Sequence, residues 1–307
     1  MSLALSTTKH ASKLRLTIHR VWMNMIRIFV IVSLWLLSST VFAKKIQITV
    51  ETDIYHLAET MLKGSTPQTI ERFDHALCQR DAVEYILVQR ALSLGGFHHE
   101  FEFHLGNFDA RNIKMLTKGI LLVSFDTIWL SHASQFQDQL FISKPVIRKG
   151  EYIAGVYTSP ANKGQLQINS LEDFAKLTVV SSKDWYVDWI TLKSMQPKKL
   201  IHEPDWLSMA KLVSLGWVDV MLAPFKREYP FRYVSDNFNL VAVEGVKVAL
   251  QDSRHFVLSR NHPYGEQAFI ALQKGLAQLR RSGLIERAYT ECGFFNSRVQ
   301  NWQLLNP

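Results

Sequence analysis

Five residues between positions 98 and 104 carry side chains that could bind a metal ion: His98, His99, Glu100, Glu102 and His104. Alternate positions of a strand lie on one face, so four of these side chains would share a face. A zinc site needs three or four ligands that converge on one point, and a flat strand face does not bring them together. We therefore interpret the run as the solvated face of a strand, and we predict no metal site and no cofactor.

Motifs of the common enzyme classes are absent from the sequence. It has no Gly-x-Ser-x-Gly turn for a nucleophilic serine and no His-Glu-x-x-His helix for a catalytic zinc. It also has no phosphate-binding loop and no Gly-x-Gly-x-x-Gly turn. We therefore assign no catalytic residue, although a fold by itself does not exclude catalysis.

The stretch Met25–Ala43, MIRIFVIVSLWLLSSTVFA, has the order of a secretory signal peptide: a charge, an apolar run and a small-x-small ending. The apolar run is shorter than the roughly 20 residues that span a bilayer. We expect a leader over residues 1–43, cleavage after Ala43 and a periplasmic location. An uncleaved anchor over residues 26–43 is the alternative. Whether translation starts at Met1, Met23 or Met25 is left open.

The positive charge of the chain is concentrated in this leader. Five of the 35 Lys and Arg residues lie in residues 1–43, which contain no Asp or Glu, so 30 basic residues remain against 27 acidic ones. The formal charge of +8 is therefore largely that of the leader. No basic run with interleaved aromatic residues follows it, so we expect no nucleic-acid partner. We expect the exported chain to be a monomer.

The sequence contains two cysteines, Cys78 and Cys292. In an oxidising compartment such a pair often forms a disulfide, which here would close a long loop. Two unpaired buried thiols are the alternative, because the sequence does not supply the Cα separation that a bridge requires.

Strand and helix patterns alternate along the chain. Strands are expected at Ile46–Val50, Phe97–Leu105, Ile120–Phe125, Tyr152–Tyr157, Thr178–Ser181, Val218–Ala223 and Phe256–Ser259. Helices are expected from Thr66 and from the capping serine Ser170, and at Ala82–Leu94, Asp109–Lys118, Trp185–Met195, Trp206–Leu215, His262–Leu279 and Leu284–Thr290. This alternation predicts an α/β fold with crossover connections.

The order of several segments resembles that of the family 3 extracellular solute-binding proteins. The segments are Met115–Gly119, Phe141–Pro145, Gly150–Gly155, Leu171–Ser181, Gly216–Leu222 and Arg281–Tyr289. Each is a weak motif, but their order and spacing together are specific. The resemblance implies a two-lobed periplasmic-binding-protein-like fold with two interlobe crossings, near 146–150 and 250–254, and a central ligand cleft. It divides the chain into residues 44–146 of the first lobe, 147–253 of the second lobe, and 254–307, which returns to the first lobe with the C-terminal helices.

Two charged anchors of the amino-acid receptors in this family are missing. The segment in which they carry the arginine that holds the ligand carboxylate reads Asp126–Ser134 here, without an arginine. The strand end at which they carry an aspartate for the ligand ammonium reads Ala223–Phe225. The resemblance therefore implies a receptor for a small polar solute that is not an ordinary α-amino acid.

The resemblance also implies which residues face the cleft. They are Asp53 and Tyr55 after the first strand, Asp126, Thr127 and Trp129 after the third, Ser182, Asp184, Trp185 and Tyr186 at a helix start of the second lobe, and Phe225. Carboxylates beside aromatic faces suit an organic cation, through charge pairing and cation–π contact. Packing of the tryptophans in the core and capping of helices by the aspartates is the alternative. Lys226 and Arg227 would instead favour an anion.

The partner of such a receptor would be an ABC transporter permease or a membrane sensor, and the sequence does not distinguish them. An enzyme on the same scaffold, of lyase or dehydratase type, is the alternative function. Its acid and base candidates are Asp126, Asp184 and His132. A carboxylate that faces the cleft with a strongly raised pKa would favour the enzyme.

Overall fold

The computed structural model describes Trp22, residues 45–106 and residues 109–306. The predicted signal peptide and its cleavage position lie outside the described residues. The chain divides into a unit of residues 1–44 and a unit of residues 45–307, and the second unit is described below. Within the described part of the chain, no helix is both long enough and apolar enough to cross a membrane.

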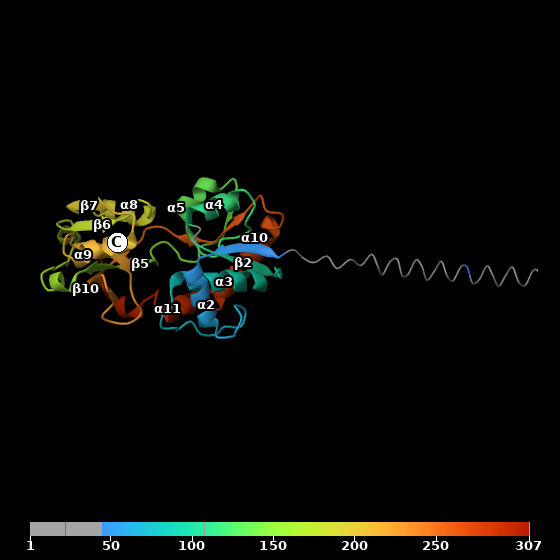
Figure 1. The fold of residues 1–307 in the computed structure, drawn as a ribbon, viewed down its shortest axis with the longest axis horizontal. Coiled ribbons are helices and arrows are strands. Elements are labelled where there is room, and N and C mark those ends of the chain that lie inside the picture. Colours follow the sequence, from blue (N-terminus) through green and yellow to red (C-terminus); the bar gives the residue numbers. More distant parts are fainter. Residues whose placement is uncertain (1–21, 23–44, 107–108, 307) are drawn as a thin grey trace, which may run out of the picture. The chain divides into compact units, whose positions relative to one another are not determined.

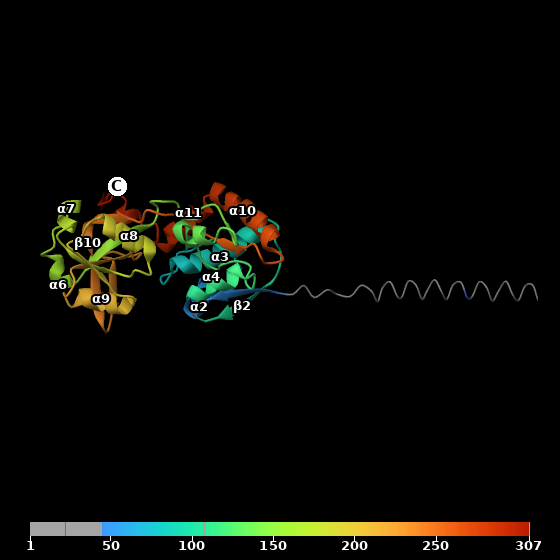
Figure 2. The same ribbon diagram turned by 90° about the horizontal axis from the view of Figure 1, so that it is seen from above.

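Residues 45–307 form two α/β lobes with separate hydrophobic cores (Figures 1 and 2). The first lobe contains β1 Ile46–Val50, α2 Thr52–Leu62, α3 Arg80–Leu94, β2 Phe101–Leu105, α4 Asp109–Thr117, β3 Ile128–Trp129, α5 Leu130–Ala133, η1 Ser134–Phe136, β4 Leu140–Ile142, β11 Arg254–His255, β12 Val257–Ser259, α10 Gly265–Arg281 and α11 Leu284–Cys292. Its strands pair two by two: β1 with β2 in parallel, and β3 with β11 and β4 with β12 antiparallel.

The core of the first lobe is centred on α3, which is buried over most of its length. Helix α10 lies so close to α3 that a Cβ atom on Gly275 would be 1.8 Å from the carbonyl oxygen of Ala91. Only a residue without a side chain fits there. This packing holds the C-terminal half of α3, whose first residues, Arg80 and Asp81, belong to the site.

The second lobe is built on one seven-stranded sheet in the order β13-β10-β5-β8-β6-β7, with β9 paired to β10. Its elements are β5 Ile153–Thr158, α6 Pro160–Lys163, α7 Leu171–Phe174, β6 Thr178–Ser181, α8 Tyr186–Ser194, β7 Lys199–His202, α9 Trp206–Ser214, β8 Val220–Pro224, β9 Arg232–Ser235, β10 Phe238–Ala249, η2 Ser297–Val299 and β13 Gln303–Leu304. The predicted cap is present: Ser170 Oγ accepts a hydrogen bond from the Asp173 N–H at 3.2 Å.

The two crossings between the lobes run side by side. Arg254 N donates to the Ile147 carbonyl oxygen at 2.9 Å, and Gly150 N donates to the Leu250 carbonyl oxygen at 3.4 Å. Beyond α11 the chain returns to the second lobe, where β13 pairs in parallel with β10. The prediction that residues 254–307 all belong to the first lobe therefore needs correction for the segment 297–305.

Two local predictions are wrong, and two elements were missed. Residues Ile120–Phe125 form no strand but lie beside β12 with one isolated bridge, between Val123 and Leu258. The apolar pattern of this segment indicates burial and not a strand, because Leu121, Leu122, Val123 and Phe125 are all buried. The expected helix from Thr66 is a turn, and α2 and the long strand β10 were not predicted. Their pairing and packing partners lie far away in sequence.

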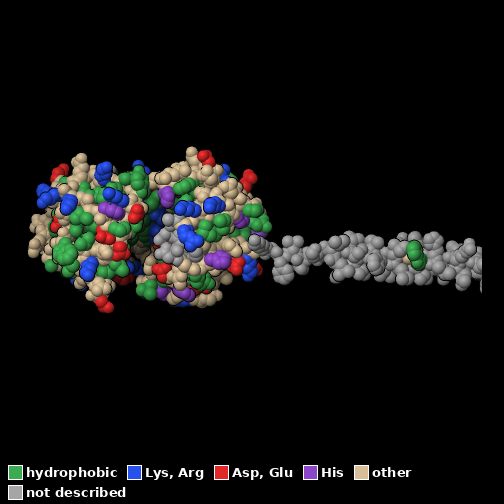
Figure 3. All heavy atoms as spheres, turned by 45° about the horizontal axis from the view of Figure 1, so that its top comes forward, with side chains coloured by type: hydrophobic (Ala, Val, Ile, Leu, Met, Phe, Trp, Pro, Cys, Tyr) green, Lys and Arg blue, Asp and Glu red, His purple; other side chains and the backbone are tan. Residues whose placement is uncertain are grey.

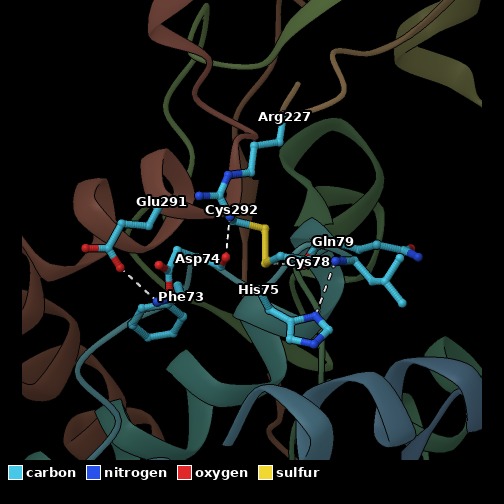
Figure 4. Close-up of a disulfide and its surroundings, with 9 residues drawn as sticks. Phe73, Asp74, His75, Cys78, Gln79, Arg227, Glu291 and Cys292 are labelled. Atoms are coloured by element: carbon cyan, nitrogen blue, oxygen red, sulfur yellow. Dashed lines mark hydrogen bonds between the residues drawn. A yellow bond between two sulfur atoms is a disulfide. The ribbon is translucent and has the colours of Figure 1, made fainter. Parts of the chain in front are cut away.

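Cys78 and Cys292 are joined by a disulfide, with their Cα atoms 5.3 Å apart (Figure 4). The bond ties the loop that precedes α3 to the last residue of α11. Arg227, from the second lobe, donates a hydrogen bond to the carbonyl oxygen of Asp74 in the same loop. The disulfide thus holds a loop that both lobes contact.

Candidate functional site

A cavity of about 740 Å³ lies between the two lobes, in the groove that Figure 3 shows. Five carboxylates line it, from Glu51, Asp81, Asp126, Asp184 and Asp188, together with the two arginines Arg80 and Arg254. Its aromatic wall consists of Phe125, Trp129, Tyr152, Trp185, Tyr186 and Trp206. Carboxylates outnumber guanidiniums, so we call this cavity the acidic cleft.

The pairing of β3 with β11 places an arginine against a tryptophan at the floor of the acidic cleft. Arg254 lies opposite Trp129 in the antiparallel register, and its guanidinium carbon is 4.6 Å from the centre of the Trp129 ring. The ring of Tyr152 lies 5.2 Å from that of Trp129. Because these contacts hold both rings, Trp129 is a rigid part of the wall.

The buried carboxylate of Glu84 connects the charged residues behind the cleft. It is fully buried and accepts hydrogen bonds from the Thr127 N–H and hydroxyl, both at 2.8 Å, and from the Tyr289 hydroxyl at 3.1 Å. Arg80, one helical turn earlier on α3, donates to it at 2.6 Å. Burial opposes the ionisation of Glu84, but Arg80, Arg254 and the Thr127 hydrogen bonds outweigh it and lower its pKa. Glu84 is therefore an ionised structural residue.

Asp126 has the opposite electrostatic environment. Burial, followed by the negative charges of Asp81 and Glu84, raises the pKa of Asp126 to about 7. Its only ion pair with another described residue is a loose one, because Nη2 of Arg254 is 3.9 Å from its carboxylate. Across the cleft, on the first turn of α8, burial raises the pKa of Asp188 to about 6. Both carboxylates would be stabilised in their charged form by a cation between them.

Asp81, Glu84 and Asp126 have carboxylate oxygens within 4.8 Å of one another, close enough to hold a metal ion. Arg80 forms ion pairs with two of them, Asp81 and Glu84. Arg254 lies beside the third. The two guanidiniums thus already supply positive charge to the cluster, so we interpret it as an ion-pair network.

The structure brings half of the predicted site residues into the acidic cleft: Asp126, Trp129, Asp184, Trp185 and Tyr186. Thr127 and Ser182 are buried behind its wall, where Thr127 binds Glu84 and the Ser182 hydroxyl accepts a hydrogen bond from the Asp184 N–H at 3.1 Å. Their role in the structure is to position the neighbouring aspartates.

The other three predicted residues lie elsewhere. Tyr55 is on α2 and packs against Tyr85 and Phe103 in the first lobe, because the segment after β1 is a helix and not a loop. Asp53 and Phe225 line a second cavity beside the acidic cleft.

Sequence reasoning missed Arg80, Asp81, Tyr152, Asp188 and Arg254, all of which line the cleft. Two of them stand where the sequence already placed a boundary: Arg254 at the end of the second crossing, and Arg80 just before a predicted helix. A charged residue at a lobe crossing was the one available signal. Asp188 carries no such signal, because it lies inside a helix whose orientation depends on the sheet.

Comparisons with known proteins bear on the fold. No protein-family model matches the chain, and no curated protein matches it. Among solved structures, the GluR0 ligand-binding core in complex with L-glutamate is similar with a TM-score of 0.53 and 16% identity, over 82% of this chain and 100% of that chain. The probable amino-acid ABC transporter extracellular-binding protein YtmK from Bacillus subtilis is similar with a TM-score of 0.54 and 15% identity, over 81% of this chain and 97% of that chain.

At these identities the similarity concerns the fold and not the ligand. Both similar structures are ligand-binding domains, and both are matched over nearly their whole length. The chain has the two-lobed fold of the family 3 periplasmic solute-binding proteins, the fold that the motifs in its sequence imply.

Proposed function

We propose that this protein is a periplasmic, non-enzymatic receptor that captures a small organic cation between its lobes for an ABC transporter or a membrane sensor. The observation that carries the proposal is the charge of the acidic cleft, in which five carboxylates face two arginines. Aromatic rings around such a cavity add cation–π attraction to charge pairing. The periplasmic location rests on the signal-peptide pattern of residues 25–43.

The arginines of the cleft are poor anchors for the carboxylate of an ordinary α-amino acid, because both are engaged. Arg254 donates from Nε to the Thr127 hydroxyl at 2.9 Å and also to the Thr127 carbonyl oxygen. Arg80 is paired with Asp81 and Glu84. A ligand carboxylate would have to share each guanidinium with these partners, through the N–H donors that remain, while facing an excess of negative charge. This supports a ligand whose dominant charge is positive.

Groups with unused binding capacity face the cleft from both lobes. Within the described residues of the first lobe, Asp126 has only its loose contact to Arg254, and the buried Ser131 hydroxyl has no hydrogen-bond partner. In the second lobe, Asp188 presents a desolvated carboxylate. A buried polar group without a partner is costly, so a ligand that satisfies these groups gains affinity. Closure of the lobes on a cation would bring them together.

We expect Asp126→Asn to weaken binding of an organic cation by about 10- to 100-fold, the loss of one charge-assisted contact of about 1.5–3 kcal/mol. The measurement is isothermal titration calorimetry with agmatine at pH 8. Asp236→Asn is the matched control, because Asp236 is exposed in the turn between β9 and β10 and outside the cleft. Equal affinities in wild type and both variants would exclude Asp126 as an anchor, and no binding by any amine would overturn the cation proposal.

Cation affinity is also expected to rise with pH, by at least tenfold between pH 5 and pH 8. The folded-state pKa of Asp126 is raised to about 7, so below pH 7 a bound cation must first displace a proton. Above that pH the carboxylate is already ionised and the affinity levels off. Titrations at pH 5, 6, 7 and 8 test this. The Asp126→Asn variant should give a flatter profile, and a profile as steep as that of wild type would assign the dependence to another group such as Asp188.

The raised pKa of Asp126 also favours a second candidate function, an enzyme on the same scaffold. His132 and Asp184, the other acid–base candidates, line the same cleft. The two functions differ in what happens to the ligand. Mass spectrometry of a ligand recovered after prolonged incubation should find it unchanged if the protein is a receptor. A converted ligand, with conversion lost in Asp126→Asn, would support the enzyme.

A further inference from the structure

A second cavity of about 700 Å³ adjoins the acidic cleft. The two share a wall of five residues, Arg80, Asp81, Tyr152, Trp206 and Pro224. Like the cleft, it lies between the lobes, because Cys78 and Phe294 of the first lobe and Phe225 and Tyr233 of the second line it. We call it the aromatic cavity. A single amino acid would fill only one of the two, since cavities of 300–1,000 Å³ each hold a drug-sized molecule.

The aromatic cavity is largely walled by rings from the second lobe. The ring of Trp206 lies 5.5 Å from that of Tyr233 and 5.3 Å from that of Phe238. From the first lobe, Phe294 packs edge-on against Tyr152 at 4.9 Å. Such a surface favours a ligand with an apolar body.

The charge of the aromatic cavity differs from that of the acidic cleft. Lys226, Arg227 and the shared Arg80 face two carboxylates, Asp53 and Asp81. Cations therefore outnumber carboxylates in the aromatic cavity, whereas carboxylates outnumber cations in the acidic cleft.

Lys226 is the cation of this cavity that is available to a ligand. Arg80 is paired with Asp81 and Glu84, and Arg227 binds the Asp74 carbonyl oxygen. Lys226 is in none of the ion pairs formed by the described part of the chain, and its ammonium lies 4.4 Å from the centre of the Tyr233 ring. Although the side chain is partly exposed, loss of water around the ammonium lowers its pKa. A carboxylate beside it would stabilise its charged form.

We propose that the aromatic cavity is a second subsite of the same ligand, so that the ligand is a short peptide with a basic first residue and a bulky apolar last residue. The basic end occupies the acidic cleft, the apolar side chain packs among the rings, and the terminal carboxylate pairs with Lys226. The inference rests on the proposed function for the cationic end and extends it to the other end of the molecule. The two adjoining cavities carry opposite excess charges. A small amine would use only the acidic cleft and would not account for the cations of the aromatic cavity.

The test is calorimetry on the whole purified protein at pH 8 with three probes: agmatine, the dipeptide Arg-Phe and Arg-Phe amide. Arg-Phe should bind at least tenfold more tightly than agmatine, and amidation should cost about tenfold, because it removes the carboxylate. Lys226→Met should abolish the difference between the acid and the amide. Lys211→Met, an exposed lysine of α9 outside both cavities, should preserve it.

The outcomes separate this inference from the proposed function. If agmatine binds but Arg-Phe gains nothing, or if Lys226→Met keeps the wild-type ratio of acid to amide, the second subsite is wrong and the cation receptor stands. If neither agmatine nor Arg-Phe binds, both proposals fail. A preference for the acid that depends on Lys226 supports the subsite.

Discussion

Replacement of Glu84 by alanine is expected to lower the free energy of unfolding by about 3–5 kcal/mol, the usual result of removing one partner from a buried ion pair. Its carboxylate is fully buried and accepts hydrogen bonds from Thr127, Tyr289 and Arg80. The variant leaves the donors of Thr127 and Tyr289 without this acceptor and removes one of the two carboxylates that pair with Arg80. The measured loss therefore reports the cost of leaving the partners of Glu84 buried and unpaired, rather than the net stabilisation by the ion pair.

The measurement is chemical denaturation followed by circular dichroism. Glu100→Ala is the matched control, since Glu100 forms an exposed ion pair with Lys45 at 3.1 Å and should cost less than about 0.5 kcal/mol. The loss for Glu84→Gln should lie between these two values. Glutamine keeps the volume of the side chain, but its NH₂ group would face a group that itself donates a hydrogen bond. A Glu84→Ala variant as stable as the control would show that the network contributes nothing to folding.

The pH dependence of this contribution follows from the sign of the shift. The pKa of Glu84 is lowered in the folded state, so its contribution is present above its unfolded-state pKa and is lost as the pH falls through its folded-state pKa. Asp126 acts in the opposite direction, because its raised pKa disfavours the folded state as the pH rises towards 7. Glu84→Gln should therefore flatten the acid side of the stability profile.

Reduction of the disulfide is expected to lower the free energy of unfolding by about 3–5 kcal/mol. The bond closes a loop with a sequence separation of 214 residues, and a loop of that size restricts the unfolded chain by roughly 5 kcal/mol in the chain-entropy model. Denaturation curves with and without reductant measure the difference. In this comparison no side chain is truncated, so no cavity is created.

A Cys78→Ala, Cys292→Ala double variant is the control for reductant acting elsewhere, because its curve should not respond to reductant. Equal unfolding midpoints for oxidised and fully reduced wild type, with reduction verified by mass, would contradict the prediction. Reduction should also loosen the wall of the aromatic cavity, since both cysteines line it. Binding of Arg-Phe is therefore expected to fall more than binding of agmatine.

Elements whose stabilising pattern lies within their own sequence were predicted well. Strand β6 is found at Thr178–Ser181 as predicted. Helix α8 is one residue shorter than predicted at each end, and α9 is one residue shorter at its C-terminal end. The alternation of exposed and more buried side chains from Phe97 to His104 is present, although β2 begins only at Phe101. Periods of two and 3.6 residues are local properties, so the sequence reveals them directly.

Elements that depend on distant partners were not predicted. Strand β10 pairs with β5, β9 and β13 and was not among the expected strands. Residues Ile120–Phe125 carry a strand pattern and are largely buried, but they form only one isolated bridge and two backbone hydrogen bonds with β12 among the described residues. Hydrophobicity records burial, and burial is compatible with several backbone conformations.

The same distinction divides the site. By itself the sequence determined the two-lobed fold, through the order of short motifs, and it identified Asp126, Trp129 and Trp185, which line the cleft. Only the tertiary structure placed Arg254 against Trp129, Arg80 beside Glu84, and Asp188 opposite Asp126. The net charge of the cleft is the sum of the charges of side chains from segments more than a hundred residues apart. Because electrostatic interactions depend on distance in space, that sum exists only once the chain has folded.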